Sequence, residues 1–421
     1  MESGVYLCID LKSFYASVEC VERGLDPMSA NLVVADPERG NGTICLAVSP
    51  SMKKLGVKNR CRVYEIPSNI DYIIAVPRMK LYINYSAEIY GIYLKYIAKE
   101  DIHVYSIDEA FLDIKDYLKL YKMGSEELAV KIMDDIKSTL GITAAAGIGT
   151  NLYLAKVALD IMAKKSIVNI GYLDEKMYCE KLWNHKPLTD FWRVGKGISD
   201  RLGKYGITTM GEIAKADEDY IYDLFGVDAE LLIDHAWGRE SVTMSDIKAY
   251  RPKSNSLSNS QVLPRDYKYD EGCLIVKEMT DSLCLDLVER GLTAKSVTLI
   301  IRYSFVSGGE SVRGTVMMPD YTNSYQIILS YILDLYYRIT DKEMSIRKIT
   351  ICFNKVTDEA FGQYNLFAEP DEIERERKLQ NAVLEIKRKY GNNALLKGMN
   401  LQSAGTAAER NLQIGGHKSG E

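Results

Sequence analysis

An apolar run that ends in an aspartate constrains the fold of this chain more than any other feature. Residues 4–10 (GVYLCID) are almost continuously apolar, which is typical of a buried strand. Residues 85–99 and 125–140 space their apolar residues as helices do. Between them, residues 103–114 (HVYSIDEAFLDI) predict two strands joined by a tight turn, and residues 143–149 (TAAAGIG) predict another strand. Strand, helix, hairpin, helix and strand in this order indicate a split βαβ unit, so we expect an α+β fold.

The rest of the chain predicts further parts, because 421 residues exceed a single core. Residues 166–240 are helical in pattern. Residues 241–260 are rich in Ser, Asn and Lys, a composition typical of a tether between domains. A second α/β unit with two amphipathic helices follows at 261–360. Residues 361–421 end in a tail rich in Gly, Asn and Gln, which we expect to be partly disordered.

Composition excludes several classes of protein. Hydrophobic residues make up 47% of the chain and charged residues 26%, as in an ordinary globular protein. No apolar run approaches the roughly 20 residues of a membrane span, and the first ten residues are too short and acidic for a signal peptide. The eight cysteines are scattered and there are four histidines, which argues against zinc. We therefore expect a cytoplasmic protein with reduced thiols and no membrane partner.

The net charge of −5 argues mildly against a nucleic-acid binder, but a local basic face is what meets phosphates. The predicted strands of the second α/β unit carry the basic residues Lys295, Arg302, Arg313, Arg347 and Lys348. Its predicted helices carry the acidic residues Asp270, Glu271, Glu278, Asp281, Asp286 and Glu289. A basic sheet backed by acidic helices would bind DNA at a near-neutral total charge. Solvated surface charge is the alternative.

Three acidic residues stand where predicted strands end. Asp10 closes the first strand, and Asp108 and Glu109 lie at the tip of the hairpin. In a sheet that pairs these elements the carboxylates would converge, and they cannot all be ionised there unless cations neutralise them. Oxygen ligands favour Mg²⁺ or Mn²⁺, and two such ions about 4 Å apart would activate a hydroxyl nucleophile and stabilise departing pyrophosphate. Taken singly, each acid has a simpler interpretation as a solvated strand end.

Five sequence blocks change that balance. They are CIDLKSFYASVE (8–19), YSIDEAFLDI (105–114), AAGIGTNLYLAKVALDIMAKK (145–165), VGKG (194–197) and KSNSLSNSQVLPRDY (253–267). In order and in structural context they resemble the signature blocks of Y-family DNA polymerases, and the resemblance covers nearly the whole chain. The branch looks like the bacterial UmuC/DinB-like proteins, particularly the Gram-positive group with a finger block of the type LAVSPSMKKLGVKNR (46–60).

The resemblance implies a right-hand polymerase with a ferredoxin-like palm, small fingers, a helical thumb and a tethered α/β little finger. The expected parts are the palm (1–10 and 79–165), fingers (11–78), thumb (166–240), linker (241–260), little finger (261–360) and tail (361–421). A primer 3′-OH would attack the α-phosphate of a template-paired dNTP, with two Mg²⁺ ions (or Mn²⁺) at the site. The family also implies low fidelity, no proofreading, and translesion synthesis during DNA repair and the SOS response.

The resemblance assigns roles to individual residues. Metal ligation falls to Asp10, Asp108 and Glu109, with the backbone carbonyl of Leu11. Phe14 and Tyr15 match the positions where main-chain amides meet the triphosphate, and such amides suit phosphate because they point outward unpaired. Tyr15 also matches the steric gate against a ribose 2′-OH, with an aromatic core residue as the alternative. Lys164 matches the lysine that contacts the triphosphate, although this sequence carries one extra residue before it. Its alternative role is as a partner of the helix dipole.

The finger block departs from the family pattern. Many relatives offer a Tyr and an Arg to the β- and γ-phosphates, where this chain has Pro50 and Lys53. Lys53 supplies a point charge but lacks the bidentate fork of a guanidinium. We therefore expect a different phosphate grip, in which Ser49, Ser51 or Lys54 could share.

Two regions are expected to contact DNA. Residues 191–207 resemble a helix-hairpin-helix, whose glycine turn aims backbone amides at DNA phosphates. A plain glycine helix cap is the alternative. The expected contacts are Gly195, Lys196 and Gly197 in the thumb, and Arg302, Arg313 and Arg347 in the little finger.

A short motif near the end predicts a protein partner. Residues 363–367 (QYNLF) look like the QxxLF peptide with which bacterial polymerases bind the sliding clamp. Gln363 would bond backbone groups while Leu366 and Phe367 fill an apolar pocket. Accessory proteins of the SOS response, which some UmuC-like relatives require, are a further class of partner that the resemblance admits.

Two other functions stay open at this point. A palm-based nucleotide cyclase also uses strand-end acids, but it needs no thumb turn, basic little finger or clamp peptide. A catalytically dead accessory subunit would bind DNA and recruit partners, but such relatives usually lose the acids that this chain retains.

Overall fold

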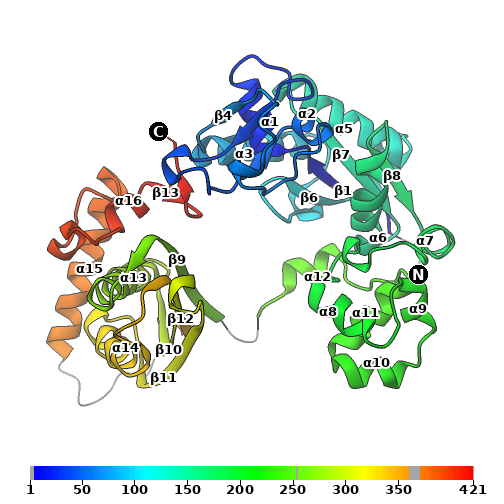
Figure 1. The fold of residues 1–421 in the computed structure, drawn as a ribbon. Coiled ribbons are helices and arrows are strands. Elements are labelled where there is room, and N and C mark those ends of the chain that lie inside the picture. The colour runs from blue at the N-terminus through cyan, green and yellow to red at the C-terminus, as the bar shows by residue number, and fades with distance from the viewer. Residues whose placement is uncertain (1–3, 253–254, 360–369, 421) are drawn as a thin grey trace. The chain divides into compact units, whose positions relative to one another are not determined.

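The computed structural model describes residues 4–252, 255–359 and 370–420. The chain folds into two compact units, Met1–Tyr250 and Arg251–Glu421 (Figure 1). Within the described residues, none of the helices combines the length and the apolar character that a membrane crossing requires.

The first unit is built on a five-stranded sheet in the order β5-β6-β1-β7-β8. Its strands are β1 (Tyr6–Leu11), β5 (Ile102–Val104), β6 (Glu109–Asp113), β7 (Ala144–Gly149) and β8 (Ile170–Leu173). The predicted buried strand β1 lies in the centre, antiparallel to both β6 and β7. In this register Asp10 stands directly opposite Glu109, so two of the three predicted acids share one end of the sheet.

Glycines on β7 allow a helix to lie directly on this sheet. A Cβ atom at Gly147 would come within 2.1 Å of the backbone oxygen of Ala155, and one at Gly149 within 2.1 Å of the backbone nitrogen of the same residue. Helix α6 (Leu152–Val157) therefore packs against β7 at backbone contact distance. Strand β8 then pairs in parallel with β7, so residues 170–173 belong to the same sheet, which contains the strands of the expected palm. The crossover that a parallel pair needs is supplied by α6 and the turns that follow it.

The other helices of this sheet layer are α1 (Phe14–Val21), α3 (Met79–Leu94), α4 (Lys115–Tyr121) and α5 (Ser125–Leu140). The helix expected at 85–99 begins earlier, at Met79, two residues after Pro77, and it ends earlier, at Leu94. After α1, the expected finger segment (11–78) continues with a small sheet in the order β3-β2-β4 and the short helix α2. These elements are β2 (Leu32–Val34), β3 (Ala47–Val48), β4 (Ile73–Ala75) and α2 (Pro50–Lys54).

Short helices complete the first unit, as the sequence predicts. They are α7 (Glu175–Leu182), α8 (Lys196–Gly203), α9 (Met210–Lys215), α10 (Glu218–Phe225), α11 (Asp228–Ala236) and α12 (Met244–Ala249). The last of these lies inside the segment expected to be a tether. Thr243 caps α12, and Met244 is buried against the core of the palm sheet. The polar composition of this segment was a poor guide, because α12 is held by a few residues, Met244 and Ile247 against the core and Lys248 through a hydrogen bond to the backbone oxygen of Ile102 (2.6 Å).

The second unit is an antiparallel sheet in the order β11-β10-β12-β9, with two helices packed on its apolar face (Figure 1). Its elements are β9 (Asn255–Tyr267), α13 (Tyr269–Glu289), β10 (Leu292–Tyr303), β11 (Ser311–Thr322), α14 (Tyr325–Ile339) and β12 (Ile346–Asp358). Strand β9 begins at Asn255, again inside the expected tether. It is an edge strand with mostly exposed side chains, so its Ser and Asn residues resemble a linker in composition.

The tail after the little finger is ordered over residues 370–420, which corrects the expectation of partial disorder. It forms α15 (Pro370–Tyr390), α16 (Ala407–Arg410) and the short strands β13 (Gln413–Ile414) and β14 (His417–Lys418). Glu278 of α13, 2% exposed, anchors it by accepting hydrogen bonds from Asn400 Nδ2 (2.9 Å) and the backbone nitrogens of Thr406 (2.9 Å) and Ala407 (3.1 Å).

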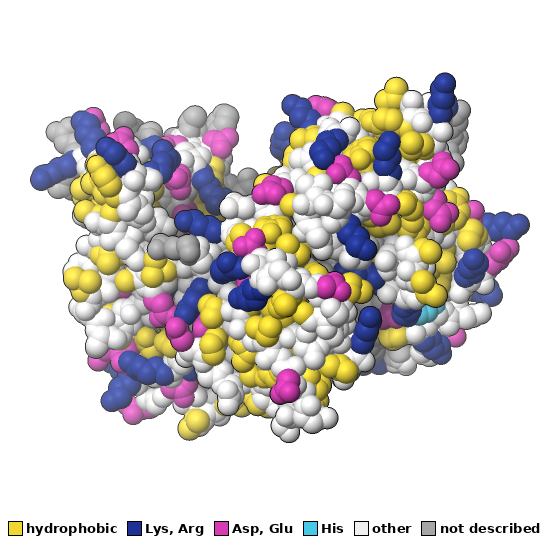
Figure 2. Space-filling model, turned by 90° about the horizontal axis from the view of Figure 1, so that it is seen from above, with side chains coloured by type: hydrophobic (Ala, Val, Ile, Leu, Met, Phe, Trp, Pro, Cys, Tyr) yellow, Lys and Arg dark blue, Asp and Glu magenta, His cyan; other side chains and the backbone are white. Residues whose placement is uncertain are grey.

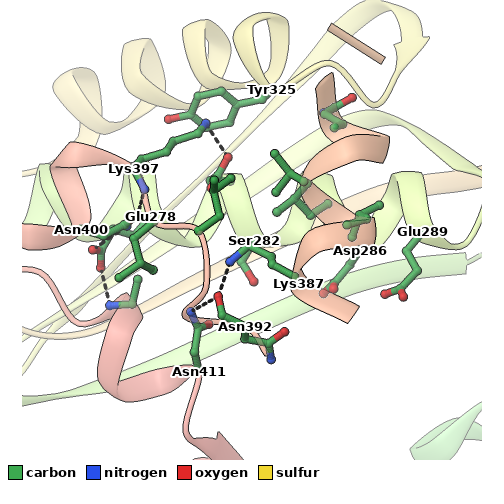
Figure 3. A pocket seen from close by; sticks show the side chains of 18 of the residues that line it. Glu278, Ser282, Asp286, Glu289, Tyr325, Lys387, Asn392, Lys397, Asn400 and Asn411 are labelled. Carbon is green, nitrogen blue, oxygen red and sulfur yellow. Dashed lines mark hydrogen bonds and ion pairs between the residues drawn. The ribbon is translucent and has the colours of Figure 1, made fainter. Parts of the chain in front are cut away.

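A cavity of about 400 Å³ lies between α13, α15 and the segment that follows α15 (Figure 3). Ion pairs cross its rim, among them Lys397 with Asp281 (2.6 Å) and Arg388 with Glu289 (3.1 Å). The cavity is therefore bounded by groups that largely neutralise one another. The predicted clamp motif at 363–367 falls outside the described residues.

Candidate active site

A pocket of about 430 Å³ lies at the end of β1, between the palm sheet and the finger segment. Its lining residues are Asp10, Leu11, Lys12, Ser13, Phe14, Tyr15, Met28, Leu46, Ala47, Pro50, Lys53, Lys54, Asn59, Asp108 and Lys164. Two carboxylates and four ammonium groups thus face one space. That combination suits a polyanionic ligand that arrives with divalent cations, because the anion would pair with the ammonium groups and the cations with the carboxylates.

The three predicted acids are brought to one end of the sheet, but their side chains have different environments. Asp10 and Asp108 line the pocket. Ser106 Oγ donates a hydrogen bond to Asp108 Oδ1 (2.7 Å). Glu109 is buried, and its Oε1 lies 2.7 Å from Lys156 Nζ. Across the part of the chain that the structure describes, no three His, Cys, Asp or Glu side chains come together closely enough to hold a metal ion.

A chain of alternating charges links Glu109 to Asp10. Lys156 Nζ lies 2.7 Å from Glu109 Oε1 and 2.9 Å from Asp160 Oδ2. Lys164 Nζ lies 2.8 Å from Asp160 Oδ1 and 3.1 Å from Asp10 Oδ2. Sequence reasoning missed Lys156 and Asp160, although their spacing of four residues is that of a helical ion pair.

These contacts shift the proton affinities at the site. Burial raises the pKa of Asp10, an effect that Lys164 opposes. Burial by itself would lower the pKa of Lys156, but its neighbours Cys8, Glu109 and Asp160 raise it. Burial would likewise lower the pKa of Lys164, but Asp10 and Asp160 outweigh burial and raise this pKa. Both lysines are therefore held in the charged form, as counter-ions of the acids.

The helix that leads to Lys164 changes its type before it ends. The helix that begins with α6 changes at Ala158–Met162 into a π-helical turn, which is followed by a 3₁₀ turn at Ala163–Lys165. A π-turn accommodates one more residue than an α-turn without ending the helix. Lys164 follows this π-turn and lines the pocket.

The turn from β1 into α1 presents main-chain groups to the pocket. Ser13 has a left-handed backbone (φ 50°) and precedes Phe14, the first residue of α1. The amides of Phe14 and Tyr15 belong to the first turn, where no intrahelical acceptor exists. Within the described residues Ser13 Oγ is buried without a hydrogen-bond partner, although it lines the pocket. Unpaired donors at a helix start suit phosphate oxygens.

Tyr15 is held in place by a neighbouring ring. It stacks on Tyr82 of α3, with ring centroids 4.5 Å apart and planes inclined by 20°. Tyr82 in turn donates a hydrogen bond to Glu19 Oε1 (2.8 Å), and Arg78 binds the same carboxylate with both Nε (3.0 Å) and Nη2 (2.9 Å). Glu19 has no exposed side-chain surface, so this network fixes α1 on α3 and with it the orientation of Tyr15.

The finger segment supplies lysines rather than serines to the pocket. Ser49 Oγ donates to the backbone oxygen of Ala30 (2.8 Å), and Ser51 Oγ donates to Asn31 Oδ1 (2.7 Å). Neither serine lines the pocket, whereas Lys53 and its neighbour Lys54 do. Burial lowers the pKa of Lys53.

Lys12 and Asn59 also line the pocket, and sequence reasoning missed both. Lys12 follows directly on the Asp10-Leu11 pair, and its side chain contacts Asn169. The adjacency of Lys12 to Asp10 was the available signal. For Asn59, 49 residues further along the chain from Asp10, the sequence offers none.

The predicted thumb contacts lie at the start of a helix. Gly195 is the N-cap of α8, and Lys196 and Gly197 are its first residues; all three are exposed. A Cβ atom at Gly195 or Gly197 would meet no neighbouring atom, so internal packing does not require these glycines. The preceding turn is 3₁₀ (Leu188–Asp190), so a short 3₁₀ turn takes the place of the first helix of the expected helix-hairpin-helix.

The little finger brings part of the predicted basic set onto one face. Arg302 pairs with Lys348 across β10 and β12, and Arg313 stands opposite Ile300, which shares the face of Arg302. Val297, Leu299 and Ile301 point the other way, into the core under the helices. On the open face Thr298 hydrogen bonds Thr315 (2.8 Å), and Ser260 hydrogen bonds Thr350 (2.7 Å).

Arg347 departs from this set, because its Nη1 lies 3.7 Å from Asp266 Oδ1. Figure 2 shows basic and acidic side chains interspersed over the face in view, in keeping with the slightly negative total charge. A basic character of the little finger is therefore a local property of its open sheet face.

Comparison with known proteins agrees with this arrangement. Residues 9–160 match the impB/mucB/samB family, and residues 254–366 match the C-terminal domain of the same family. UvrX of Bacillus subtilis, described as a putative UV-damage repair protein, is 33% identical over 98% of this chain and 97% of its own. DNA polymerase IV 2 of the same organism is 28% identical, with 99% of both chains aligned.

Solved structures show the same fold. A Y-family DNA polymerase chimera made of Dbh with a short Dpo4 segment matches with a TM-score of 0.66, at 20% identity, over 84% of this chain and 99% of its own. A second solved chain, described as a Dbh ternary complex, matches with a TM-score of 0.52 over 83% of this chain. The predicted α+β fold is thereby confirmed.

Proposed function

The chain belongs to the Y family of DNA polymerases, and from that premise we propose that its pocket joins a deoxynucleotide to a primer 3′-hydroxyl with divalent cations held at Asp10, Asp108 and Glu109. It is a DNA-directed DNA polymerase of the kind that copies damaged templates. The names of its relatives, UvrX and DNA polymerase IV, agree with this function. The substrates are primer-template DNA and dNTPs. Low fidelity without proofreading, a role in the SOS response and a cytoplasmic location are part of the proposal.

The observation that carries the proposal is the charge pattern of the pocket. A deoxynucleoside triphosphate brings about four negative charges, and the lining offers four lysines with only two carboxylates. The carboxylates stand beside the strand-to-helix turn, where the amides of Phe14 and Tyr15 have no intrahelical acceptor and the buried hydroxyl of Ser13 has no partner among the residues that the structure describes. A triphosphate accompanied by cations satisfies all of these groups together.

The donor set suits Mg²⁺ or Mn²⁺. Asp10, Asp108 and Leu11 line the pocket, and the two carboxylates with the backbone carbonyl of Leu11 would offer oxygen ligands, which hard divalent cations prefer. When bound, a pair of such ions would make the primer hydroxyl a better nucleophile and neutralise charge on the leaving pyrophosphate. Glu109 would complete the ligand set, and Lys156 holds its carboxylate in place at 2.7 Å.

The chain's own residues position the substrates. Lys53, Lys54 and Lys164 would bind the triphosphate as point charges, which replaces the Tyr and Arg of many relatives. Tyr15, held by its stack on Tyr82, would place its ring where a ribose 2′-OH would project. Catalysis then rests on orientation and charge neutralisation.

DNA would be held by sequence-independent contacts. The exposed start of α8 at Gly195–Gly197 offers backbone amides to phosphates, and Arg302, Arg313 and Lys348 offer charge from the open face of the little finger. We further propose that QYNLF (363–367) binds the sliding clamp. Accessory SOS proteins are proposed as partners on the family resemblance alone.

The decisive experiment is primer extension opposite a damaged and an undamaged template. Asp108→Ala should abolish both reactions, because the pocket then retains only one of its two carboxylates. Asp116→Ala, which removes an exposed acid from α4, is the matched control and should extend primers as the wild type does. Extension by Asp108→Ala at the wild-type rate would refute the metal assignment. Cyclic nucleotide formation from the same dNTPs without template would favour a cyclase, and an inactive wild type that binds DNA would favour an accessory subunit.

A further inference from the structure

Two lysines serve the catalytic acids, and they differ in how firmly they are held. The side chain of Lys156 is 8% exposed and lies between Glu109 (2.7 Å) and Asp160 (2.9 Å). The side chain of Lys164 is 39% exposed and lies between Asp160 (2.8 Å) and Asp10 (3.1 Å). Asp160 is thus shared by both lysines, one enclosed and one at the edge of the pocket.

The ammonium of Lys164 and a divalent cation require the same carboxylate. Asp10 is the acid that closes β1 at the pocket, and Lys164 Nζ is bonded to its Oδ2. An ammonium within hydrogen-bond distance of that oxygen repels a divalent cation that approaches the same group. The two cannot occupy Asp10 together without an electrostatic cost, so one must give way to the other.

We propose that Lys164 is an exchangeable counter-ion of Asp10, which neutralises this acid until a divalent cation takes its place, and that Asp160 is the positioning residue that keeps the released ammonium beside the pocket for the triphosphate. The inference deepens the proposed function and rests on it. Metal binding and nucleotide binding are then coupled, because the divalent cation that binds Asp10 releases the ammonium of Lys164, which can then bind the triphosphate.

The backbone at Lys164 fits this exchange. Asp160 lies four residues after Lys156 and four residues before Lys164, so its two carboxylate oxygens reach both ammonium groups. The π-turn at Ala158–Met162 and the 3₁₀ turn at Ala163–Lys165 place Lys164 on the last turn of this helical run, at the pocket edge. A long side chain anchored at one carboxylate can swing between two partners with little movement of the backbone. Lys156 has no such freedom, because it is enclosed.

Opposite effects on two ligands distinguish this mechanism from a simple phosphate contact. In Lys164→Met, Asp10 loses its competing ammonium, so Mn²⁺ should bind more tightly in the absence of nucleotide. The same variant should bind dNTP more weakly, because the cation for the triphosphate is gone. In Asp160→Asn, Lys164 keeps Asp10 as its only carboxylate partner, so Mn²⁺ should bind more weakly. A residue that only supports the fold would lower both affinities together.

The experiment measures free Mn²⁺ by electron paramagnetic resonance during titration of the full chain, without DNA or nucleotide. Lys164→Met should lower the Kd for Mn²⁺ by about three- to fivefold, the upper part of the range expected for a partly exposed ion pair. The control Lys165→Met removes equal charge from an exposed lysine of the same turn. It should change the Kd by less than about twofold, and Lys164→Arg should keep the wild-type value.

A double-mutant cycle tests the role of Asp160. If Asp160 acts through Lys164, the rise in Kd caused by Asp160→Asn should shrink when Lys164 is already Met. Primer extension on the same proteins should give a higher KM for dNTP in Lys164→Met. The inference is overturned if Lys164→Met leaves the Kd for Mn²⁺ unchanged or raises it, or if Asp160→Asn has the same effect in both backgrounds. These outcomes are distinguishable from a failure of the proposed function, which is tested by wild-type primer extension and its loss in Asp108→Ala.

Discussion

Replacing Lys156 by methionine should destabilise the first unit more than any other single removal of charge at the active site. The two side chains of the Lys156–Glu109 pair are each 8% exposed. Lys156→Met would leave Glu109 buried as an uncompensated carboxylate, with the thiol of Cys8 (3.1 Å) as its remaining donor. Breaking a buried pair from one side costs about 3–5 kcal/mol. Methionine fills a similar volume, so the cost is electrostatic rather than a packing defect.

The size of the effect can be measured as a melting temperature. For a cooperative unit of about 250 residues, each kcal/mol lowers Tm by about 2–4 °C, so Lys156→Met should lower it by about 6–20 °C. Lys164→Met is the internal comparison, because that side chain is 39% exposed and the pair with Asp10 contributes less than about 1 kcal/mol. Its Tm should fall by less than about 4 °C.

A second substitution isolates the cause. Adding Glu109→Gln to Lys156→Met removes the orphaned charge, so the double variant should regain much of the lost stability although it stays inactive. Differential scanning calorimetry of the full chain resolves the two units if they unfold separately. A Tm for Lys156→Met within about 3 °C of wild type, or a double variant less stable than Lys156→Met, would show that the ion pair between Lys156 and Glu109 does not stabilise the first unit.

Three further outcomes are expected. Tyr15→Ala should admit ribonucleotides while retaining polymerisation, which single-nucleotide insertion with dNTP and rNTP measures; unchanged sugar selectivity would refute the gate. Burial would raise the pKa of Glu19, but hydrogen bonds from Arg78, Arg23 and Tyr82 outweigh burial and lower this pKa. Ionised Glu19 therefore contributes its full share to the free energy of unfolding above the unfolded-state pKa of about 4.3. That contribution is lost as pH falls through the lower folded-state pKa. Urea unfolding of wild type and Glu19→Gln should therefore show a stability gap that narrows on acidification, and a gap independent of pH would contradict this. Replacing residues 366 and 367 with alanine should abolish binding to the sliding clamp in a pull-down assay with little loss of unassisted extension; retained binding would make the motif a coincidence.

Local sequence was sufficient for the elements that carry a single strong pattern. The buried strand ending at Asp10, the hairpin around Asp108 and the strand–helix block after residue 143 all appear where the pattern placed them. In each of these segments the spacing of apolar residues and the residues at its ends indicate the same element. A strand buried on both faces is a nearly continuous apolar run, which few other elements show. The family matches confirm the polymerase assignment that these blocks suggested.

Composition was a poor guide where one buried contact decides the outcome. The expected tether contains α12 and the start of β9, and the expected partly disordered tail is folded on Glu278. In each case most residues are polar and exposed, as in a linker. The buried side chain of Met244 helps to hold the first segment in place, and the enclosed carboxylate of Glu278 holds the second. The average composition of either segment does not reveal these contacts.

The amino-acid sequence by itself determined which acids stand at the ends of the central strands, the class of metal that would suit them and the family of the protein. Only the tertiary structure decided what those acids contact. Lys156 and Asp160 lie about 50 residues from Glu109 along the chain, and β7 brings them alongside it because its glycines let α6 lie against the sheet. Side-chain partners depend on such backbone approaches between distant segments, whereas strand ends depend on neighbours in sequence. For that reason Asp10, Asp108 and Glu109 could be found as separate acids, whereas the contacts of Lys164 with Asp10 and of Lys156 with Glu109 could not.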